Sequence, residues 1–542
     1  MKLSKRIIAI LLTLCFIMGG MISVNASGET QNSTVWGGEK DIAWYEADPT
    51  AKVFHIDTAN ELAGLAQLVN AGTEDFEERT IVLDKDIVLN SGVASSWESS
   101  APNNTWTPIG CEEHKFKGTF VGNGHTVSGI YYSDIGETTG DNIGLFGCVE
   151  GATIKKVRVE NTYLHGRIKV GGIVGMAYGV TITDCYSSVN IQAEGNEGSI
   201  GGYAGILGFN ESAPATIKGC WVAGKIYNLK GVGAGSSGRN YSNGTGGIVG
   251  CFNVSGNVID DCLVTAEING TSHVGGVVGR CNEVSGNVVT IKDTLMLGTV
   301  SAHKPNKTTF GGEFIGIMMG TATATMTNVY GKSGFTLALD GDCAPSNTYS
   351  NSESVWAANK TGSVVDDKSN AWSKTASDHR LSDAALKALV GVGEEKKLAV
   401  GEWAVVEGKD YPIPAYFAPA QFLGVQFAVV DSDYYNARFV GTIGDTEGYT
   451  KVGFEILLWD GVDTVALKYD LSDATVYTSI LAGTSSGIDD EITVEGKSLI
   501  ALTIMNIPTK YCKYQIRTFV SDGTNTIYGK TVTMDRPATW NQ

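Results

Sequence analysis

The sequence has few positive charges, few prolines and no long apolar run beyond its N-terminus, and each shortage excludes a class of protein. Lysine and arginine together number 40 against 58 acidic residues, which gives a formal net charge of −18. An acidic surface repels nucleic acid and anionic lipid, because binding to either releases counterions from basic groups. With 11 prolines and 42% hydrophobic residues, the chain is neither a proline-rich linker nor disordered. We expect no nucleic-acid partner and no membrane insertion.

The ten cysteines and seven histidines lack the spacing of disulfide scaffolds and metal sites. No C-x-x-C pair and no H-E-x-x-H motif occurs, so we expect no metal and no other cofactor. Two acidic stretches, Asp340–Asp342 and Asp489–Glu491, lack a full set of calcium ligands. Cys15 follows Leu14, where a lipidation site would carry a small residue.

Residues 1–26 have the pattern of a secretory signal peptide. A basic start with Lys2, Lys5 and Arg6 precedes the apolar stretch 7–18, and a small-residue motif ends at Ala26. Cleavage there removes three positive charges and leaves a mature chain of net charge −21. We therefore expect a secreted protein, either free outside the cell or associated with its surface, which begins with an extension over residues 27–50.

Glycine is abundant, with 69 residues, and predicts a fold with many chain reversals. A Gly-Gly-apolar-apolar-Gly element recurs, and its final glycines are 28, 30, 45, 29 and 37 residues apart. The gap of 45 contains an insertion at 228–243. The copies are Gly171–Gly175, Gly201–Gly205, Gly246–Gly250 and Gly275–Gly279, with degenerate versions at Ile143–Gly147 and Gly311–Gly316.

A second element follows each glycine element and ends in a bend and a small residue. The bend position holds Lys, Asp, Gly, Asp, Asp and Asn in turn, mostly residues that tolerate left-handed backbone angles. The next position holds Val, Cys, Cys, Cys, Thr and Val, which suggests a buried ladder of small side chains with free thiols. The copies are Thr153–Val157, Thr181–Cys185, Thr216–Cys220, Val258–Cys262, Thr290–Thr294 and Thr325–Val329.

A repeat this short cannot bury its own apolar face, so its copies must stack on one another. The β-rich pattern favours a parallel β-helix of roughly nine coils between residues 80 and 350; ordinary hairpins of an antiparallel sandwich are the alternative. Ahead of the coils, residues 58–69 have helical periodicity, and Thr58 with Glu61 forms a capping box. We expect this helix to close one end of the stack, and a short helix after Ser382 to close the other.

The repeats resemble the GLUG repeats of secreted bacterial proteins. The resemblance is closest where Gly171–Gly175 is followed by Asp184–Tyr186, and where Gly201–Gly205 is followed by Gly219–Trp221. It covers residues 51–418 and implies a right-handed single-stranded parallel β-helix with short capping helices at a cell surface. Such proteins are often adhesins or parts of surface enzymes. Asp or Gly replaces the asparagine of the second element in most copies, which adds nothing about a ligand.

Prolines near residue 419 mark a boundary, after which the glycine repeat stops. Residues 419–542 contain about seven short alternating strands, which predict an antiparallel β-sandwich of the immunoglobulin-like type. The predicted strands lie near 424–430, 436–440, 451–457, 474–481, 498–505, 512–520 and 526–533. The segments 437–439, 451–455 and 522–529 resemble a C-terminal module of secreted clostridial proteins.

Four residues are candidates for ligand binding: Trp221, Tyr227, Arg239 and Tyr241. The last two lie in the insertion, and loops on rigid scaffolds often carry recognition. Trp221 occupies the same repeat position as Tyr186 and Tyr330. If these side chains point outward, they form a strip suited to sugar rings or a partner; if they point inward, they form a core stack.

Catalysis is the competing interpretation, because β-helices also host polysaccharide lyases and hydrolases. Hydrolysis requires two carboxylates about 5–9.5 Å apart, and Asp184, Asp260, Asp261 and Asp293 recur near one repeat position. That position is the predicted bend, so we favour a turn role. His165, Arg167 and Lys169 alternate and would share one strand face, which favours an exposed polar surface. We assign no catalytic residue.

The sequence therefore predicts a non-catalytic, adhesin-like secreted protein. Its expected partners are polysaccharide, glycoprotein or another surface protein, and the oligomeric state is open. A polysaccharide-degrading β-helix enzyme is the alternative. A structural spacer that presents the C-terminal domain is the third class.

Overall fold

The computed structural model is mostly β-strand with few helices. It describes residues 35–542 except 137–138, 195–200, 229–242, 272, 283–287, 304–309, 319–321, 336–337, 340–356, 360–362, 367–379, 392–397, 400–401, 407–408, 419, 444–450, 461–463, 471–497, 522–525, 530–531 and 537–542. Within these residues, no helix is both long and apolar enough to cross a membrane. The predicted signal peptide and both acidic stretches considered for calcium lie outside them.

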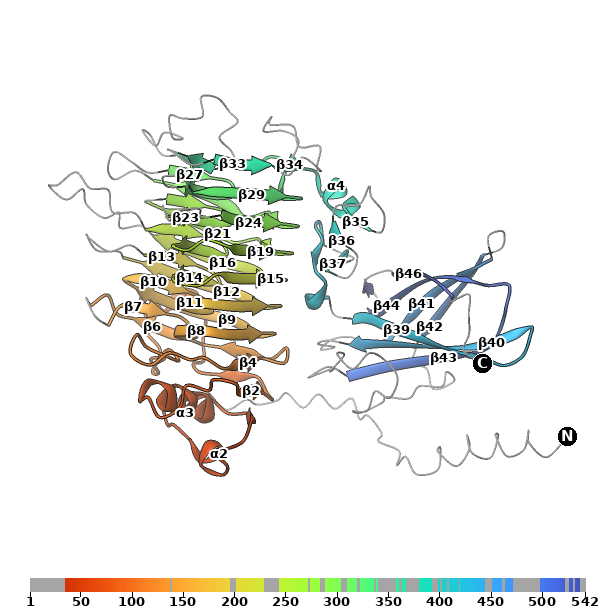
Figure 1. The fold of residues 1–542 in the computed structure, drawn as a ribbon, viewed down its shortest axis with the longest axis horizontal. Coiled ribbons are helices and arrows are strands. Elements are labelled where there is room, and N and C mark those ends of the chain that lie inside the picture. The colour runs from red at the N-terminus through yellow and green to blue at the C-terminus, as the bar shows by residue number, and fades with distance from the viewer. Residues whose placement is uncertain are drawn as a thin grey trace. The chain divides into compact units, whose positions relative to one another are not determined.

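Three parallel sheets are built from residues 53–381, the 6-stranded one from residues 141–312 only, and their strands stack one above another (Figure 1). Each copy of the repeat adds a strand to the 6-stranded sheet, then to the 15-stranded sheet, then to the 13-stranded sheet. Each strand therefore pairs in parallel with the equivalent strand of the next copy, as in a parallel β-helix. The alternative of antiparallel hairpins is wrong for this region.

The strands of each sheet are as follows. The 15-stranded sheet contains β1 (Val53–Ile56), β2 (Thr80–Leu83), β4 (Thr119–Val121), β8 (Phe146–Lys155), β11 (Val174–Thr183), β14 (Leu207–Asn210), β15 (Ala215–Lys218), β18 (Val249–Phe252), β19 (Asn257–Asp260), β23 (Val278–Cys281), β24 (Val288–Lys292), β28 (Ile315–Met318), β29 (Thr323–Thr327), β32 (Ala357–Asn359) and β33 (Ser363–Asp366). The 6-stranded sheet contains β7 (Asp141–Ile143), β10 (Ile168–Gly171), β13 (Gly202–Ala204), β17 (Gly244–Gly246), β22 (His273–Gly275) and β27 (Phe310–Gly312). The 13-stranded sheet contains β3 (Ile87–Val88), β5 (Thr126–Ser128), β6 (Tyr131–Ser133), β9 (Arg158–Gly166), β12 (Tyr186–Ala193), β16 (Trp221–Asn228), β20 (Leu263–Val264), β21 (Glu267–Gly270), β25 (Leu295–Met296), β26 (Thr299–Ala302), β30 (Tyr330–Lys332), β31 (Ala338–Leu339) and β34 (Arg380–Leu381).

The predicted N-terminal helix is confirmed as α3 (Ala59–Asn70). Thr58 is its N-cap and completes the capping box with Glu61. Its apolar face, with Leu62 and Leu65 fully buried, belongs to the same core as the first strands. The stack begins earlier than the sequence predicted, because β1 already pairs in parallel with β2, so α3 is an insertion within the first coil. A short helix, α2 (Ala43–Glu46), precedes it.

The bend and the small-residue ladder of the second element are both confirmed. All six bend residues have positive φ, from 47° at Asp293 to 64° at Gly219. The six residues that follow them are fully buried in the core. Within the described residues each cysteine is free, and burial raises the pKa of the Cys220 thiol well above its ordinary value. These thiols are packing residues.

One copy of the glycine element was predicted in the wrong frame. The strand register pairs Gly171 with Ala204 and Val174 with Leu207, so the equivalent of Gly171–Gly175 is Ala204–Gly208 rather than Gly201–Gly205. The adopted frame has Ala204 where the pattern has its first glycine, whereas Gly201–Gly205 matches the pattern in full. Both apolar pairs, Tyr203–Ala204 and Ile206–Leu207, are fully buried, so it is the pairing with the neighbouring coils that identifies the frame.

The repeat glycines allow close approach between sheets rather than chain reversal. A Cβ added to Gly250 would lie 2.3 Å from the backbone nitrogen of Tyr203, on the 6-stranded sheet. A Cβ on Gly279 would lie equally close to the nitrogen of Thr245, one coil further on. Neither glycine has positive φ. Glycine therefore recurs once per coil because the backbones of the 15-stranded and 6-stranded sheets come into contact once per coil.

The C-terminal region contains two antiparallel sheets that share one core. One sheet has β39 (Ala420–Val429), β40 (Tyr434–Ile443) and β43 (Ser498–Pro508); the other has β41 (Lys451–Trp459), β42 (Thr464–Asp470), β44 (Lys513–Ser521), β45 (Thr526–Tyr528) and β46 (Val532–Asp535). Buried side chains of both sheets, such as Phe439 and Tyr514 with rings 6.2 Å apart, form one cluster. The sequence pattern did not predict β42, and the predicted strand at 474–481 lies outside the described residues.

Candidate functional site

The outer face of the 13-stranded sheet carries the two described ligand-binding candidates, Trp221 and Tyr227. Alternation along β12 and β16 places Val189 and Val222 in the core, so Tyr186 and Trp221 point outward. The strand register aligns an apolar row across neighbouring coils. The apolar row consists of Tyr186, Trp221, Leu263, Leu295 and Tyr330.

The apolar row is covered by a later part of the chain, which we call the strap, Arg380–Ala418. Phe417 packs its ring 6.0 Å from that of Tyr186 and 5.9 Å from that of Trp221. Lys409 lies over the indole of Trp221, whose Nε1 donates a hydrogen bond to Thr265 Oγ1 at 2.9 Å. The prediction that these side chains form an interior core stack is therefore wrong. The row points outward, and the strap of the same chain packs on it.

The strap runs back along the stack from its last described coils. It contains α4 (Asp383–Ala388), capped by Ser382 as predicted, then β35 (Val390–Gly391), β36 (Leu398–Ala399), β37 (Trp403–Ala404), β38 (Ile413–Pro414) and a 3₁₀ turn, η2 (Ala415–Phe417). An ion pair of 3.0 Å joins Asp383 to Lys332 near its start. Trp403 then reaches Asp261, in the bend after β19, and Tyr416 lies near Lys156. Leu386, Trp403 and Ile413 are buried with the apolar row.

Beside the apolar row, the same face carries polar and aromatic residues. Among the described residues, none of their contacts is with the strap. Along one row, His165, Gln192, Tyr227 and Asn269 pair across four coils. These four side chains are all half-buried, and Lys225 and Glu267 beside them are exposed. Hydroxyl, amide and imidazole groups at the ~4.8 Å spacing of strands form a periodic surface.

Hydrogen bonds hold three of these side chains, His165, Gln192 and Tyr227, in defined positions. Tyr163 OH lies 3.2 Å from Gln192 Oε1, and the Tyr227 hydroxyl donates to Glu267. Burial and this bond to a carboxylate raise the pKa of Tyr227, so the phenol is neutral and remains a donor at physiological pH. His165 Nε2 lies 3.3 Å from Glu194 Oε1. The aromatic partners Tyr131 and Tyr163, whose rings stack 5.8 Å apart, were not singled out from the sequence.

Of the four predicted ligand-binding residues, the structure describes two. Trp221 and Tyr227 lie on one strand, β16. Trp221 packs against the strap, whereas Tyr227 does not belong to that cluster. Arg239 and Tyr241 lie outside the described residues, in the segment that begins two positions after Tyr227. The signal that would have found Gln192 and Asn269 is the alternation of polar residues along β12 and β21.

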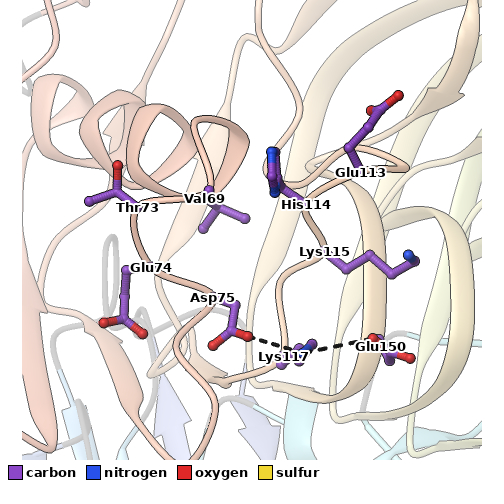
Figure 2. Close-up of a pocket in the computed structure, with 10 residues that line it drawn as sticks. Val69, Thr73, Glu74, Asp75, Glu113, His114, Lys115, Lys117 and Glu150 are labelled. Carbon is purple, nitrogen blue, oxygen red and sulfur yellow. Dashed lines mark ion pairs between the residues drawn. The ribbon is translucent and has the colours of Figure 1, made fainter.

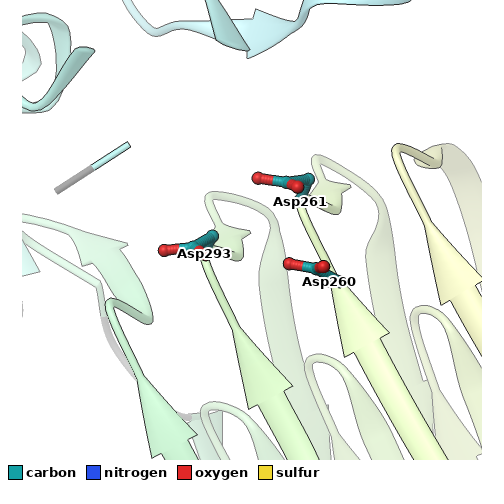
Figure 3. Close-up of side chains that lie close together, drawn as sticks. All are labelled: Asp260, Asp261 and Asp293. Atoms are coloured by element: carbon teal, nitrogen blue, oxygen red, sulfur yellow. The ribbon is translucent and has the colours of Figure 1, made fainter. Parts of the chain in front are cut away.

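The aspartates at the repeat bends form a compact cluster (Figure 3). Asp260 ends β19, while Asp261 and Asp293 occupy the bends of two adjacent coils, and carboxylate oxygens of the three lie within 4.8 Å of one another. Such a group has the composition of a cation site.

The chain's own cations compensate this cluster. Lys292 Nζ lies 2.8 Å from Asp260 Oδ2, and Lys218 Nζ lies 3.5 Å from Asp261 Oδ2. Trp403 Nε1 donates to Asp261 Oδ1 at 2.9 Å, which joins the cluster to the strap. Asp260 and Asp261 are 6% and 3% exposed. Two carboxylates that flank a glycosidic bond need room for a sugar ring, so this arrangement supports an architectural role.

The environment of Asp261 raises its pKa to about 7. Burial is the main cause, the charges of Asp260, Glu402 and Asp293 add to it, and Lys218 opposes it. In an unfolded chain the group titrates near 3.9. Its contribution to stability is thus greatest below about pH 4 and is lost as the pH rises through about 7.

We expect Asp261→Asn to stabilise the protein at pH 8 by on the order of 2 kcal/mol, and to have little effect at pH 4. Asparagine keeps an oxygen that accepts the bond from Trp403 and removes the buried charge. Urea unfolding midpoints at pH 4, 6 and 8 test this. The exposed Asp433→Asn serves as control and is expected to follow the wild type; parallel curves for Asp261→Asn and wild type would contradict the assignment.

The predicted strand face of His165, Arg167 and Lys169 does not exist. Arg167 lies in the corner between β9 and β10, so the three residues belong to two sheets. Arg167 donates from Nε to Asp141 Oδ1 at 2.7 Å, and Lys169 lies over the ring of Phe209. The alternation extends across a corner, where the period-2 rule of a strand fails.

An open cavity of about 410 Å³ lies beside α3 and is lined by charged residues (Figure 2). Lys117 bridges Asp75 at 3.1 Å and Glu150 at 3.9 Å, and Glu74 pairs with Arg79 at 3.1 Å. The two hydrogen bonds from Glu77 and Lys117 hold the pKa of Asp75 below its ordinary value despite burial. Both Lys117 and Arg79 are therefore engaged by carboxylates of the same chain at this end of the stack.

No protein-family model, curated protein or solved structure matches this chain.

Proposed function

We propose that this chain is a secreted, non-catalytic protein that binds glycans or other surface macromolecules through the outer face of the 13-stranded sheet. The observation that supports it is the row of His165, Gln192, Tyr227 and Asn269 across four coils. A linear polymer with repeated hydroxyl groups matches a protein surface whose donors and acceptors also repeat. Arg239 and Tyr241, in the insertion that follows Tyr227 in the sequence, stay candidates for the same function.

The proposed architecture is a right-handed single-stranded parallel β-helix of the GLUG-repeat type over residues 51–418, followed by an immunoglobulin-like β-sandwich over 419–542. Residues 1–26 are proposed as the signal peptide. The parallel register and the positive φ at each bend support the first part. The shared core of the two antiparallel sheets supports the second.

Binding is preferred over hydrolysis because the strongest carboxylate cluster, Asp260, Asp261 and Asp293, is engaged by lysines and by Trp403. Binding is preferred over a spacer role because ordered aromatic and amide side chains are not needed on a passive rod. These contacts fix the residues before a ligand arrives, which lowers the entropic cost of binding.

Affinity electrophoresis of the full secreted chain through gels that contain neutral or acidic polysaccharides tests the proposal. We expect retardation by at least one polymer, without shortening of that polymer. Tyr227→Ala is expected to weaken binding at least fivefold, about 1 kcal/mol, through loss of ring contact.

Tyr178→Ala is the matched control, because Tyr178 also donates its hydroxyl to a glutamate, Glu112, but on the 15-stranded sheet. It should bind like the wild type. Shortened polymer would favour the enzyme, and no retardation by any polymer would favour the spacer.

A further inference from the structure

A second cluster of charged and aromatic side chains lies on the outer face of the sheet formed by β42, β41 and β44. Phe454, Ile456 and Leu458 of β41 enter the core, so Glu455, Leu457 and Trp459 point to the opposite side. The register places Lys468 and Arg517 directly beside Glu455.

Glu455 is saturated by donors. Arg517 donates to its Oε2 from Nε at 2.8 Å and from Nη2 at 2.5 Å. Lys468 Nζ lies 2.7 Å from Oε1, and Tyr528 OH donates to Oε1 at 2.9 Å. Burial alone would raise the pKa of Glu455, but the bonds from these three donors outweigh burial, and the net effect is a pKa below the ordinary value. The group is therefore ionised at neutral pH.

One carboxylate thus faces two cations, which leaves a net positive charge. The guanidinium of Arg517 lies 3.6 Å from the ring centre of Tyr528 and is held in place by that ring. Its Nη1 has no hydrogen-bond partner among the described residues. Lys513 lies on the same face, 5.2 Å from the ring centre of Trp459, but its cross-strand neighbour Asp535 offsets its charge, so the excess cation is the one beside Glu455.

An open hollow of about 550 Å³ lies at the side chains of Glu455, Lys468 and Arg517. Leu457 and Ala466 form an apolar floor, and the exposed amide of Gln515 lies beside Leu457 in the same row. The next row lines one side of the hollow with Lys468 and Arg517, and the Glu455 carboxylate lies between them. A small apolar floor flanked by fixed polar groups is the usual composition of a small-ligand site.

We propose that this hollow binds the acidic sugar unit of a glycan, with its carboxylate on Arg517 and Lys468 and its ring on Leu457 and Ala466. Arginine forks and ammonium groups recognise carboxylates, and apolar side chains contact the faces of sugar rings. Charge complementarity favours this ligand over a neutral sugar, because the positive face lies on a chain of net charge −18. The site is separate from the one proposed on the 13-stranded sheet.

Calorimetric titration of the full chain with hexagalacturonate, in 50 mM salt without divalent cations, tests the proposal. We expect binding that weakens on raising the salt concentration to 500 mM, whereas maltohexaose, which is neutral, binds at least tenfold more weakly at this site. Free galacturonate distinguishes a polymer site from a site for the monomer: equal affinity per site would keep the assignment and identify free uronates as the ligand.

Two variants locate the binding. Arg517→Lys keeps the charge beside Glu455 and removes the fork, and Lys468→Gln removes one cation; each is expected to weaken hexagalacturonate binding at least fivefold. Lys52→Gln, which removes an exposed lysine paired with Glu78 ahead of β1, is the matched control and should have no effect. Thermal melting of each variant confirms that it is folded.

The proposal is overturned if hexagalacturonate binds no more tightly than maltohexaose, or if both variants bind it like the wild type. Loss of binding in Tyr227→Ala with full binding in Arg517→Lys would place the acidic glycan on the 13-stranded sheet. That outcome would overturn this inference and keep the proposed function. Normal binding in Tyr227→Ala with loss in Arg517→Lys would support the inference alone.

Discussion

Gly250→Ala is expected to destabilise the protein by about 3 kcal/mol or more, the largest effect of any single methyl group considered. The added Cβ would lie 2.3 Å from the nitrogen of Tyr203 and 2.5 Å from the backbone of Gly202. Both contacts are backbone atoms of the 6-stranded sheet, so no side chain can rotate away. Relief requires the two sheets to separate over at least one coil, which disturbs the neighbouring registers.

Gly151→Ala is the matched control for this substitution. Gly151 has a φ of +62°, and an added Cβ there meets no atom within 4 Å. Only the backbone conformation opposes it, at a cost of about 1 kcal/mol. Urea midpoints followed by far-ultraviolet circular dichroism compare the two. Equal losses for Gly250→Ala and Gly151→Ala would show that the repeat glycines serve backbone conformation rather than contact between sheets.

This contact explains why the repeat could be found from the sequence, and also why one copy was misread. The pattern of glycines reports a contact made once per coil, and the second element located each bend correctly from Asp184 to Asn328. Pattern alone favours the frame Gly201–Gly205, which matches in full, over the adopted frame that ends at Gly208. The decision depends on which residues pair with Gly171 and Val174 of the preceding coil, and that register is a property of the neighbouring coils.

The start of the stack was missed for a related reason. Val53–Ile56 is a four-residue strand with no glycine element after it, and α3 separates it from its partner Thr80–Leu83. A short strand is defined by its pairing more than by its own residues. The helix itself was predictable, because the capping box and the apolar spacing are local signals.

The candidate site was predictable only in part. The sequence placed Trp221 in a row with Tyr186 and Tyr330, and the register confirms that row. It did not reveal the cover, because Trp403 is 142 residues from its partner Asp261 and the strap has no repeat pattern. Contacts of such separation, made by short strands and turns, leave no periodic signal.

Trp403→Ala is expected to release the strap locally and to cost about 3–5 kcal/mol. The indole is fully buried between the strap and Leu263, Leu295 and Tyr330, and its Nε1 is bonded to Asp261. Its removal leaves a large cavity and a buried carboxylate without that donor. Amide hydrogen exchange over residues 398–418 is expected to become faster, while exchange in β11 and β12 stays slow.

Trp403→Phe separates the two causes, since phenylalanine restores most of the packing but has no N–H group. We expect it to cost about 1–3 kcal/mol, the loss that follows when a buried acceptor is left without its partner. At pH 5 this cost should shrink, because the protonated form of Asp261 tolerates burial better than the carboxylate does. If Trp403→Phe were as damaging as Trp403→Ala at both pH 5 and pH 8, the strap would be held by indole packing alone, and the link between Asp261 and strap attachment would be wrong.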